Sequence, residues 1–281
     1  MQILRDARKR EKQILILLSI IIIVIYLFPF YICVVNAFKT PLETAESAVA
    51  LPGHLILDNF REAAKKISFG TAIKNSLIVT IVADALIVLC ASMSGYAIAR
   101  YAKANRFFRF LDKVFMSSQM LPFQVVMIPV YKIFRSMGLL NTLLGEIIML
   151  TGISVAYASF LYVGFVKSVP CEIEEAAHID GAGPFRTFWK IVFPLLRPIT
   201  ATVAALHAMW LWNDFNIALL LLQKDAVRTI TIKQFYFFNQ YSSDYNLAFA
   251  ASLMGMVPVL IFFMLMQKHL VAGITGGSVK G

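Results

Sequence analysis

The sequence predicts an all-α integral membrane protein with six transmembrane helices. Three observations predict it: hydrophobic residues make up 59% of the 281-residue chain, charged residues only 15%, and the mean hydropathy is +0.74. Ordinary soluble domains contain about 45–50% apolar residues, and a soluble chain of this size could not bury the excess. The composition therefore excludes a disordered chain, a collagen and a small disulfide scaffold, and it argues against a soluble enzyme.

Six apolar runs are long enough to cross a bilayer, at about 20 residues per crossing. The first follows a basic amino-terminal segment, but it is too long for a signal peptide and no small-residue cleavage site follows it. Polar residues and prolines interrupt the third, which is typical of a helix packed inside a bundle or beside a cavity. The six runs are residues 14–38, 76–99, 110–131, 142–166, 199–222 and 247–266.

Charge then sets the orientation of these spans. With a cytoplasmic amino end, 16 of the 26 Lys and Arg residues fall in inside segments and 10 in outside segments, as expected for cytoplasmic loops. The tails 1–13 and 267–281 are then both cytoplasmic, and 14–266 forms one membrane domain. The same bias accounts for the net charge of +10 without nucleic-acid binding. Three cysteines without a CxxC pair predict neither a disulfide framework nor a metal site.

The loop at 167–198 is predicted to form two short helices. Its first helix begins with three glutamates, where the helix dipole favours negative charge. Gly181 supplies a left-handed stop, and Pro184 can open the second helix. The small residues Ala176 and Ala177 would allow the first helix to sit closely in a groove on another protein. The alternative from the residues alone is an amphipathic loop lying on the membrane surface.

Several motifs in this chain match one family. In the loop they are Glu175, Ala176, Ala177, Gly181, Ile191 and Pro194; elsewhere they are residues 36–40, 75–76, 212–214 and 271–281. Together they resemble binding-protein-dependent ABC importer permeases with an EAA loop, in the carbohydrate-uptake branch of maltose and multiple-sugar type. Phe193 stands where that family usually has Leu. The resemblance runs through nearly the whole chain and implies a type I importer permease fold with cytoplasmic coupling helices.

The resemblance implies a transport subunit without catalytic residues, in a bacterial inner membrane. Its implied partners are a second homologous permease in a heterodimer, two ATPase subunits and an extracytoplasmic solute-binding protein, besides membrane lipid. The chain contains no GxxxxGK[ST] motif that could cradle ATP phosphates. ATP and Mg would therefore be held by the ATPase subunits, and this chain would carry no cofactor. The implied ATPase-coupling residues are Glu174, Glu175, Ala176, Ala177, Asp180, Gly181, Ile191 and Pro194, with Gly276, Gly277 and Lys280 in the tail.

One group of residues in the fifth span is a candidate for contact with the solute. Trp210, Trp212, Asn213 and Asp214 in the fifth span offer the aromatic faces and hydrogen-bonding groups that a sugar needs. The alternative is a structural interhelical hydrogen bond with interfacial tryptophans. Asp84, in the second span, would be costly facing lipid and has no partner that the sequence identifies.

An aromatic outer loop follows the fifth span. By resemblance it would reach into the binding protein and help to release sugar. The alternative is packing at the membrane interface or against the pore. The residues concerned are Phe235, Tyr236, Phe237, Phe238 and Tyr241.

Other function classes fit the sequence less well. A secondary transporter or channel tends to show inverted repeats and matched intramembrane charges, and a membrane enzyme needs clustered His, Asp or Ser; the sequence shows neither pattern. Within the importers, glycerol phosphate or another polar solute is the alternative to sugar. A phosphate would favour basic residues deep in the spans, and none is present there, so a neutral sugar is expected. The resemblance to the maltose and multiple-sugar branch implies, more narrowly, an oligosaccharide.

Overall fold

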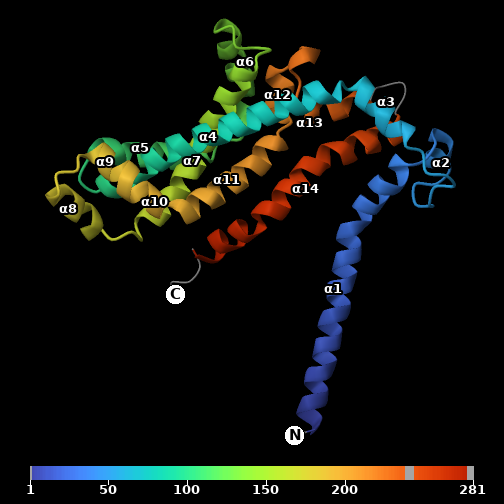
Figure 1. Cartoon of the computed structure of the whole chain (residues 1–281), viewed down its shortest axis with the longest axis horizontal. Coiled ribbons are helices and arrows are strands. Elements are labelled where there is room, and N and C mark those ends of the chain that lie inside the picture. The colour runs from blue at the N-terminus through green and yellow to red at the C-terminus, as the bar shows by residue number, and fades with distance from the viewer. Residues whose placement is uncertain (1, 238–243, 277–281) are drawn as a thin grey trace. The chain divides into compact units, whose positions relative to one another are not determined.

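The structure is a computed structural model that describes residues 2–237 and 244–276, with side chains from 12–237 and 244–267. Within these ranges all regular secondary structure is helical (Figure 1). The chain divides into two compact units. The first contains residues 1–69 and 234–256, and the second contains residues 70–233 and 257–281.

Four described helices are long and apolar enough to cross a membrane. Two bent helix pairs raise this to six if each pair is one span. The first pair is α5 (Arg106–Ser118) with α6 (Phe123–Ser136), bent by 109°, and the second is Pro184–Leu195 with α11 (Arg197–Trp212), bent by 76°. The four long helices are α1 (Gln2–Ala37), α4 (Phe69–Tyr101), α7 (Leu143–Val166) and α14 (Tyr245–Gly276).

The third and fifth predicted spans differ most from continuous helices. Pro122 stands at the amino end of α6, after the break, where a proline cannot continue the preceding helix. The fifth run, 199–222, is divided between α11 and α12 (Asn216–Leu221). The Asp214 carboxylate accepts a hydrogen bond from the backbone N–H of Ala218 at 2.9 Å. Asp214 thus satisfies a backbone N–H in the first turn of α12, whereas the sequence predicts one continuous helix.

A network of buried polar side chains holds the first unit together around the end of α1. The Lys39 ammonium, 1% exposed, donates to the carbonyl oxygen of Ser47 at 2.7 Å. The Asn59 amide, from α3 (Asp58–Lys66), donates to the carbonyl oxygens of Ala37 and Lys39 at 2.9 and 2.8 Å. Asn246 of α14 donates to the Asn59 side chain at 3.0 Å. Residues 36–40, singled out in the sequence, thus have a structural role here.

The short helix α2 (Pro41–Glu46) begins with a reciprocal cap. The Thr40 hydroxyl accepts from the N–H of Glu43, and the Glu43 carboxylate accepts from the N–H of Thr40 at 2.9 Å. Glu43 also accepts from the N–H of Gly53 at 2.9 Å. These hydrogen bonds, with that from Thr40 foremost, hold the pKa of Glu43 below its ordinary value.

The core of the second unit lies between α4, α7 and α11. One face of α4 buries Val79, Ala83, Ile87 and Ala91 at a spacing of four residues, as expected for one stripe of a helix. This stripe belongs to a cluster with Tyr162 of α7 and residues of α11. The chain's small residues allow α4 and α7 to approach closely, as membrane helices often do.

In the second unit, residues 226–230 are hydrogen-bonded to the start of α4. Asn75 donates to the carbonyl oxygens of Ala226 and Arg228 at 3.0 and 3.1 Å. The Ser76 hydroxyl accepts from the N–H of Ile230 at 2.9 Å. The elements that these hydrogen bonds hold are η2 (Asp225–Val227) and the start of α13 (Ile230–Gln234). The next element, η3 (Phe235–Phe237), belongs to the first unit.

Candidate functional site

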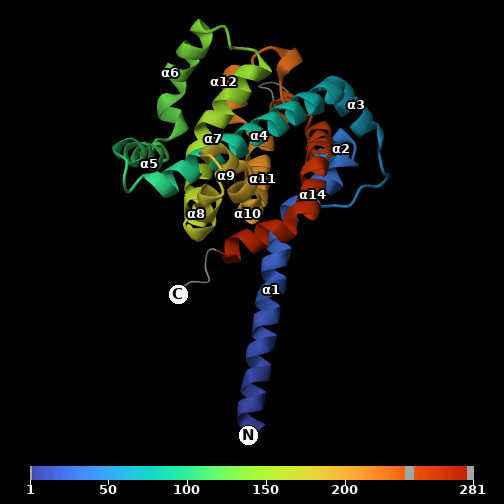
Figure 2. The ribbon, with the colours of Figure 1, turned by 60° about the vertical axis from the view of Figure 1, so that its left-hand side comes forward.

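The loop at 167–198, called the coupling loop below, forms the two short helices that its sequence predicts. The first helix is α8 (Glu172–Ile179), and the second begins with α9 (Pro184–Thr187). Gly181 lies between them with φ of +77°, a conformation that glycine adopts without strain. Beyond α9, the chain continues through a π-helical turn, η1 (Phe188–Val192), and through α10 (Phe193–Leu195). Figure 2 shows these helices gathered near one end of α4.

The predicted coupling residues do not all face the same way. Glu175, Ala176 and Asp180 are exposed. Ala177 and Glu174, by contrast, are buried, at 5% and 8% exposure. The alanine pair therefore offers only one methyl group outward, while the other packs inside the loop. Of the remaining predicted residues, Gly181 is exposed, and Ile191 and Pro194 are half-buried.

A hollow of about 410 Å³ opens between α8 and the second helix of the loop. It carries charges of both signs, with Asp180 on one side and Arg186 and Lys190 on the other. Its complete lining is Ala177, Asp180, Ala182, Arg186, Lys190 and Ile191. The loop thus presents a small, charged and concave surface.

Glu174 faces the end of α4. Its carboxylate accepts from Arg100 and from the Tyr96 hydroxyl. In the sequence, Arg100 is one of the basic residues that set the orientation, and Tyr96 belongs to no motif. No local pattern could have found this cluster, because its members are 74 and 78 residues apart in the chain.

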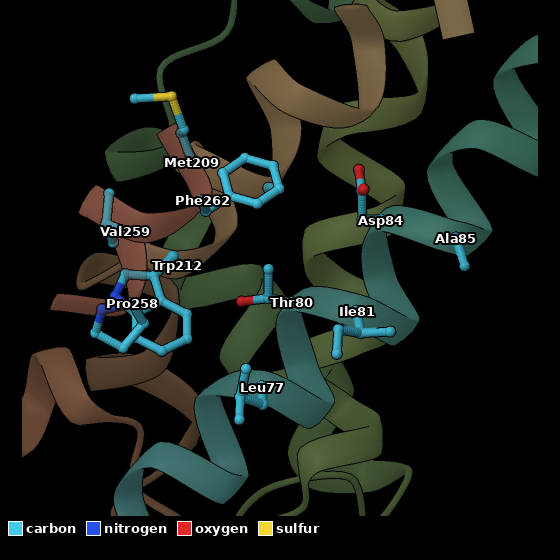
Figure 3. Close-up of a pocket in the computed structure, with 11 residues that line it drawn as sticks. Leu77, Thr80, Ile81, Asp84, Ala85, Met209, Trp212, Pro258, Val259 and Phe262 are labelled. Carbon is cyan, nitrogen blue, oxygen red and sulfur yellow. The ribbon is translucent and has the colours of Figure 1, made fainter. Parts of the chain in front are cut away.

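A second hollow, of about 450 Å³, lies between α4, α11 and the later part of α14 (Figure 3). Leu77, Thr80 and Asp84 of α4 lie on one side, and Trp212 of α11 lies on the other. The Thr80 hydroxyl and one Asp84 oxygen are buried without a hydrogen-bond partner among the described residues. Such atoms are costly in an apolar setting and are available to accept or share a proton with a further group. The walls are otherwise apolar: Ile81, Ala85, Ala208, Met209, Pro258, Val259 and Phe262.

The four predicted substrate-path residues divide between two places. Trp212 lines the pocket of Figure 3, whereas Trp210, Asn213 and Asp214 line a separate hollow of about 420 Å³ at the break between α11 and α12. Trp210 is 53% exposed, and its ring lies 5.4 Å from that of Tyr157. The Asn213 amide donates to the carbonyl oxygen of Met209 at 2.8 Å. The hollow at the break between α11 and α12 therefore combines an open indole face with amide and carboxylate groups.

A further carboxylate inside a predicted span, not among the predicted site residues, is buried in α7. Glu146, in the first turn of α7, is 1% exposed, and its Oε2 has no hydrogen-bond partner in the described part of the chain. The available signal was a single acidic residue inside the predicted span 142–166.

The aromatic outer loop is described only in part. Phe235 and Tyr236 are exposed, whereas Phe237 is buried at 2%. Phe238 and Tyr241 lie outside the described residues, as do Gly277 and Lys280 of the tail. Gly276 is the last residue of α14.

Comparisons with known proteins support the resemblance drawn from the sequence. The family described as "Binding-protein-dependent transport system inner membrane component" matches residues 87–276. The probable starch degradation products transport system permease AmyC of Thermoanaerobacterium thermosulfurigenes is 38% identical, over 96% of this chain and 97% of that protein. The melibiose/raffinose/stachyose import permease MelC of Bacillus subtilis is 33% identical, over 99% of this chain and 100% of that protein.

The fold is also that of a solved transporter. A crystal structure of a bacterial ABC transporter involved in the import of the acidic polysaccharide alginate matches with a TM-score of 0.80 and 20% identity, over 92% of this chain and 95% of that one. The predicted helical permease fold is therefore confirmed. The chain belongs to the binding-protein-dependent transport system inner membrane components, and it is a multi-pass permease of that family and not its ATPase.

Proposed function

We propose that this chain is the permease subunit of an ATP-driven oligosaccharide importer. The family is dependent on a binding protein, and the relatives at 38% and 33% identity are named for starch degradation products and for melibiose, raffinose and stachyose. In this proposal a second homologous permease completes the path, and two ATPase subunits supply ATP and Mg. Both tails lie in the cytoplasm, where the ATPases bind.

The exposed face of α8 carries the coupling role. Glu175, Ala176 and Asp180 point outward from an eight-residue helix whose direction is fixed by the left-handed Gly181. An acidic and small-residue face of this kind suits a groove on a protein better than an apolar bilayer. The ATPase would bind this face, and its closure would move the loop. In the tail, Gly276, Gly277 and Lys280 would add to the same contact.

The sugar would pass the pocket of Figure 3, which Trp212 lines, and the hollow at the break between α11 and α12. Trp210 supplies an aromatic face, while Asn213 and Asp214 supply hydrogen-bonding groups at the edge of the same hollow. Neither this hollow nor the pocket of Figure 3 is lined by Lys or Arg. This favours a neutral sugar over glycerol phosphate, the alternative solute. On the outer side, the exposed Phe235 and Tyr236 would contact the binding protein, together with Phe238 and Tyr241, whereas the buried Phe237 would support them from inside.

The experiment is co-expression with the ATPase, the second permease and the binding protein, followed by co-purification and sugar uptake into proteoliposomes. Glu175→Lys should abolish ATPase co-purification and uptake, because it reverses the charge on the docking face. The matched control is Glu46→Lys, the same reversal at an exposed site on α2, which should leave both unchanged. Normal association and uptake in the Glu175→Lys complex would contradict the docking assignment. Uptake by the purified chain alone would show a secondary transporter instead.

A further inference from the structure

Two adjacent glutamates in α8 face in opposite directions. Glu175 is exposed, whereas the Glu174 side chain is only 10% exposed and points toward α4. Neighbouring residues on a helix are about 100° apart around its axis, so one turn can bind an external partner and an internal helix at the same time. The proposed ATPase contact accounts for Glu175. It does not account for Glu174.

Both oxygens of Glu174 are bound by side chains of α4. Oε1 accepts from Arg100 Nε at 2.7 Å and lies 2.6 Å from Arg100 Nη2. Oε2 accepts from the Tyr96 hydroxyl at 2.7 Å. Arg100 Nη2 also donates to the carbonyl oxygen of Val169 at 2.9 Å, just before α8. Hydrogen bonds between ionised partners are short and strong, and this group is largely shielded from water, with Arg100 12% exposed.

The same end of α4 also holds the second helix of the loop. The Tyr96 ring lies 5.2 Å from the ring of Phe188, which is 4% exposed and opens the π-helical turn η1. Arg100 and Tyr96 thus contact both arms of the coupling loop from a single helix. A displacement of α8 would reach α4 through these contacts without passing along the backbone.

The covalent route out of the loop is less direct. It runs through the π turn η1 and then through the 76° bend before α11. Irregular helical segments of this kind often act as hinges, so they would absorb part of a displacement. By contrast, α4 is one helix from Phe69 to Tyr101 without an internal proline. Asp84, on the pocket of Figure 3, lies 16 residues before Arg100, or about 24 Å along the axis.

We propose that Tyr96, Arg100 and Glu174 form a tie through which the coupling loop moves α4, so that an ATPase acting on α8 displaces the wall of the membrane pocket. The inference rests on the proposed function, because it assigns the path by which the ATPase acts on the solute route. These three are positioning residues: they touch neither the ATPase nor the sugar.

The test uses the assembled complex in proteoliposomes, with ATPase association, ATP hydrolysis and sugar uptake measured together. Glu174→Gln and Arg100→Gln should keep association and hydrolysis but lower the sugar transported per ATP by about tenfold, in the range typical of coupling between sites. The double variant should be no worse than either single one, because both remove the same interaction. The control is Lys66→Gln, which removes an exposed ion pair with Glu62 and Asp244 and should transport at the parent ratio.

If both single variants transport as much sugar per ATP as the parent complex, the tie is wrong. It is also wrong if ATPase association falls in proportion to uptake. If the variants do not fold, the tie is tested by the distance between two spin labels in a complex that keeps Tyr96, Arg100 and Glu174. The labels occupy Cys171, which is exposed, and Lys103→Cys beyond α4, with Cys33 and Cys90 replaced by Ser. The tie predicts the same label distance with and without ATP, whereas separation on ATP binding overturns it. A parent complex that transports no sugar overturns the proposed function instead, and the label distances still test the tie.

Discussion

Replacing Gly95 by Ala should force α4 and α7 apart. A Cβ at Gly95 would lie 2.6 Å from the Cβ of Tyr162 and 3.0 Å from the carbonyl oxygen of Ser159. Ordinary carbon contacts are about 3.5–4.0 Å, so the helices would have to separate by roughly 1 Å. The Ser94 and Ser159 hydroxyls, 2.7 Å apart beside this contact, would separate with them.

The cost follows from two opposing effects. Overpacking of a well-packed interior costs about 1–3 kcal/mol. Alanine regains about 0.5–1 kcal/mol because it has less backbone freedom to lose on folding. We therefore expect the Gly95→Ala chain to lose about 1–2 kcal/mol, or several degrees in melting temperature for a domain of this size.

The assay is thermal unfolding of the purified chain in detergent, compared with two alanine substitutions in α7. A Cβ at Gly152 or Gly164 has no neighbour within 4 Å, so Gly152→Ala and Gly164→Ala should be neutral or slightly stabilising. If Gly95→Ala melts at the same temperature as these two controls, the close approach of α4 and α7 is wrong.

Three further predictions follow from single positions. Gly181→Ala should weaken ATPase co-purification, because a φ of +77° costs alanine about 1–2 kcal/mol. The control Gly183→Ala, at a φ of −72° and in open space, should bind the ATPase normally. Equal binding by both variants would show that the left-handed conformation of Gly181 does not matter for docking. Thr80→Val removes a buried hydroxyl without a hydrogen-bond partner among the described residues, so the melting temperature of the variant should not fall. Half-maximal uptake should need a higher sugar concentration, because the pocket loses a polar group. A lower melting temperature would contradict the assignment by showing that the hydroxyl has a partner. Hydrogen bonds from the N–H groups of Thr40 and Gly53 lower the pKa of Glu43, so the loop they close should be stabilised above the unfolded pKa of about 4.3 and loosen as the pH falls through the lower folded pKa. Hydrogen exchange at Gly53 measures this: Glu43→Gln should exchange rapidly at neutral pH and Glu46→Gln, on the exposed side of α2, should not.

The features that the sequence could predict are local. Apolar runs locate the helices because a bilayer demands length and apolarity together. The coupling loop was foreseeable because an acidic first turn, a left-handed glycine and a proline act within a few residues of where they stand. Gly181 is in the left-handed region, and Pro184 opens α9, as their residue types require.

The features that the sequence could not predict depend on tertiary pairing. Glu174 and Glu175 are identical side chains at adjacent positions, and they differ because Arg100 of α4 binds the Glu174 carboxylate. Trp210 and Trp212 are two positions apart, so helical periodicity already places them on different faces, but which hollow each face lines depends on the neighbouring helices. The break at Asp214 depends on side-chain hydrogen bonding, since a carboxylate within an apolar run can either face a neighbouring helix or accept from the backbone N–H groups of a following helix.

Exposure has a different meaning on the two kinds of surface that this chain presents. Every described side chain of α1 from residue 12 to residue 31 is exposed, and nearly all are apolar. Because lipid tails are as apolar as these side chains, nothing drives such a helix to bury itself against its own chain. The exposed face of α8 carries the carboxylates of Glu172 and Glu175 beside Ile173 and Ile179. A bilayer core would not solvate the carboxylates, so they must face water or a polar partner. Glu174, one residue from Glu175, is paired with Arg100 on the inner side. The polarity of the exposed residues, more than their exposure, thus separates the apolar helix α1 from the charged surface of α8, to which the proposed function assigns the ATPase contact.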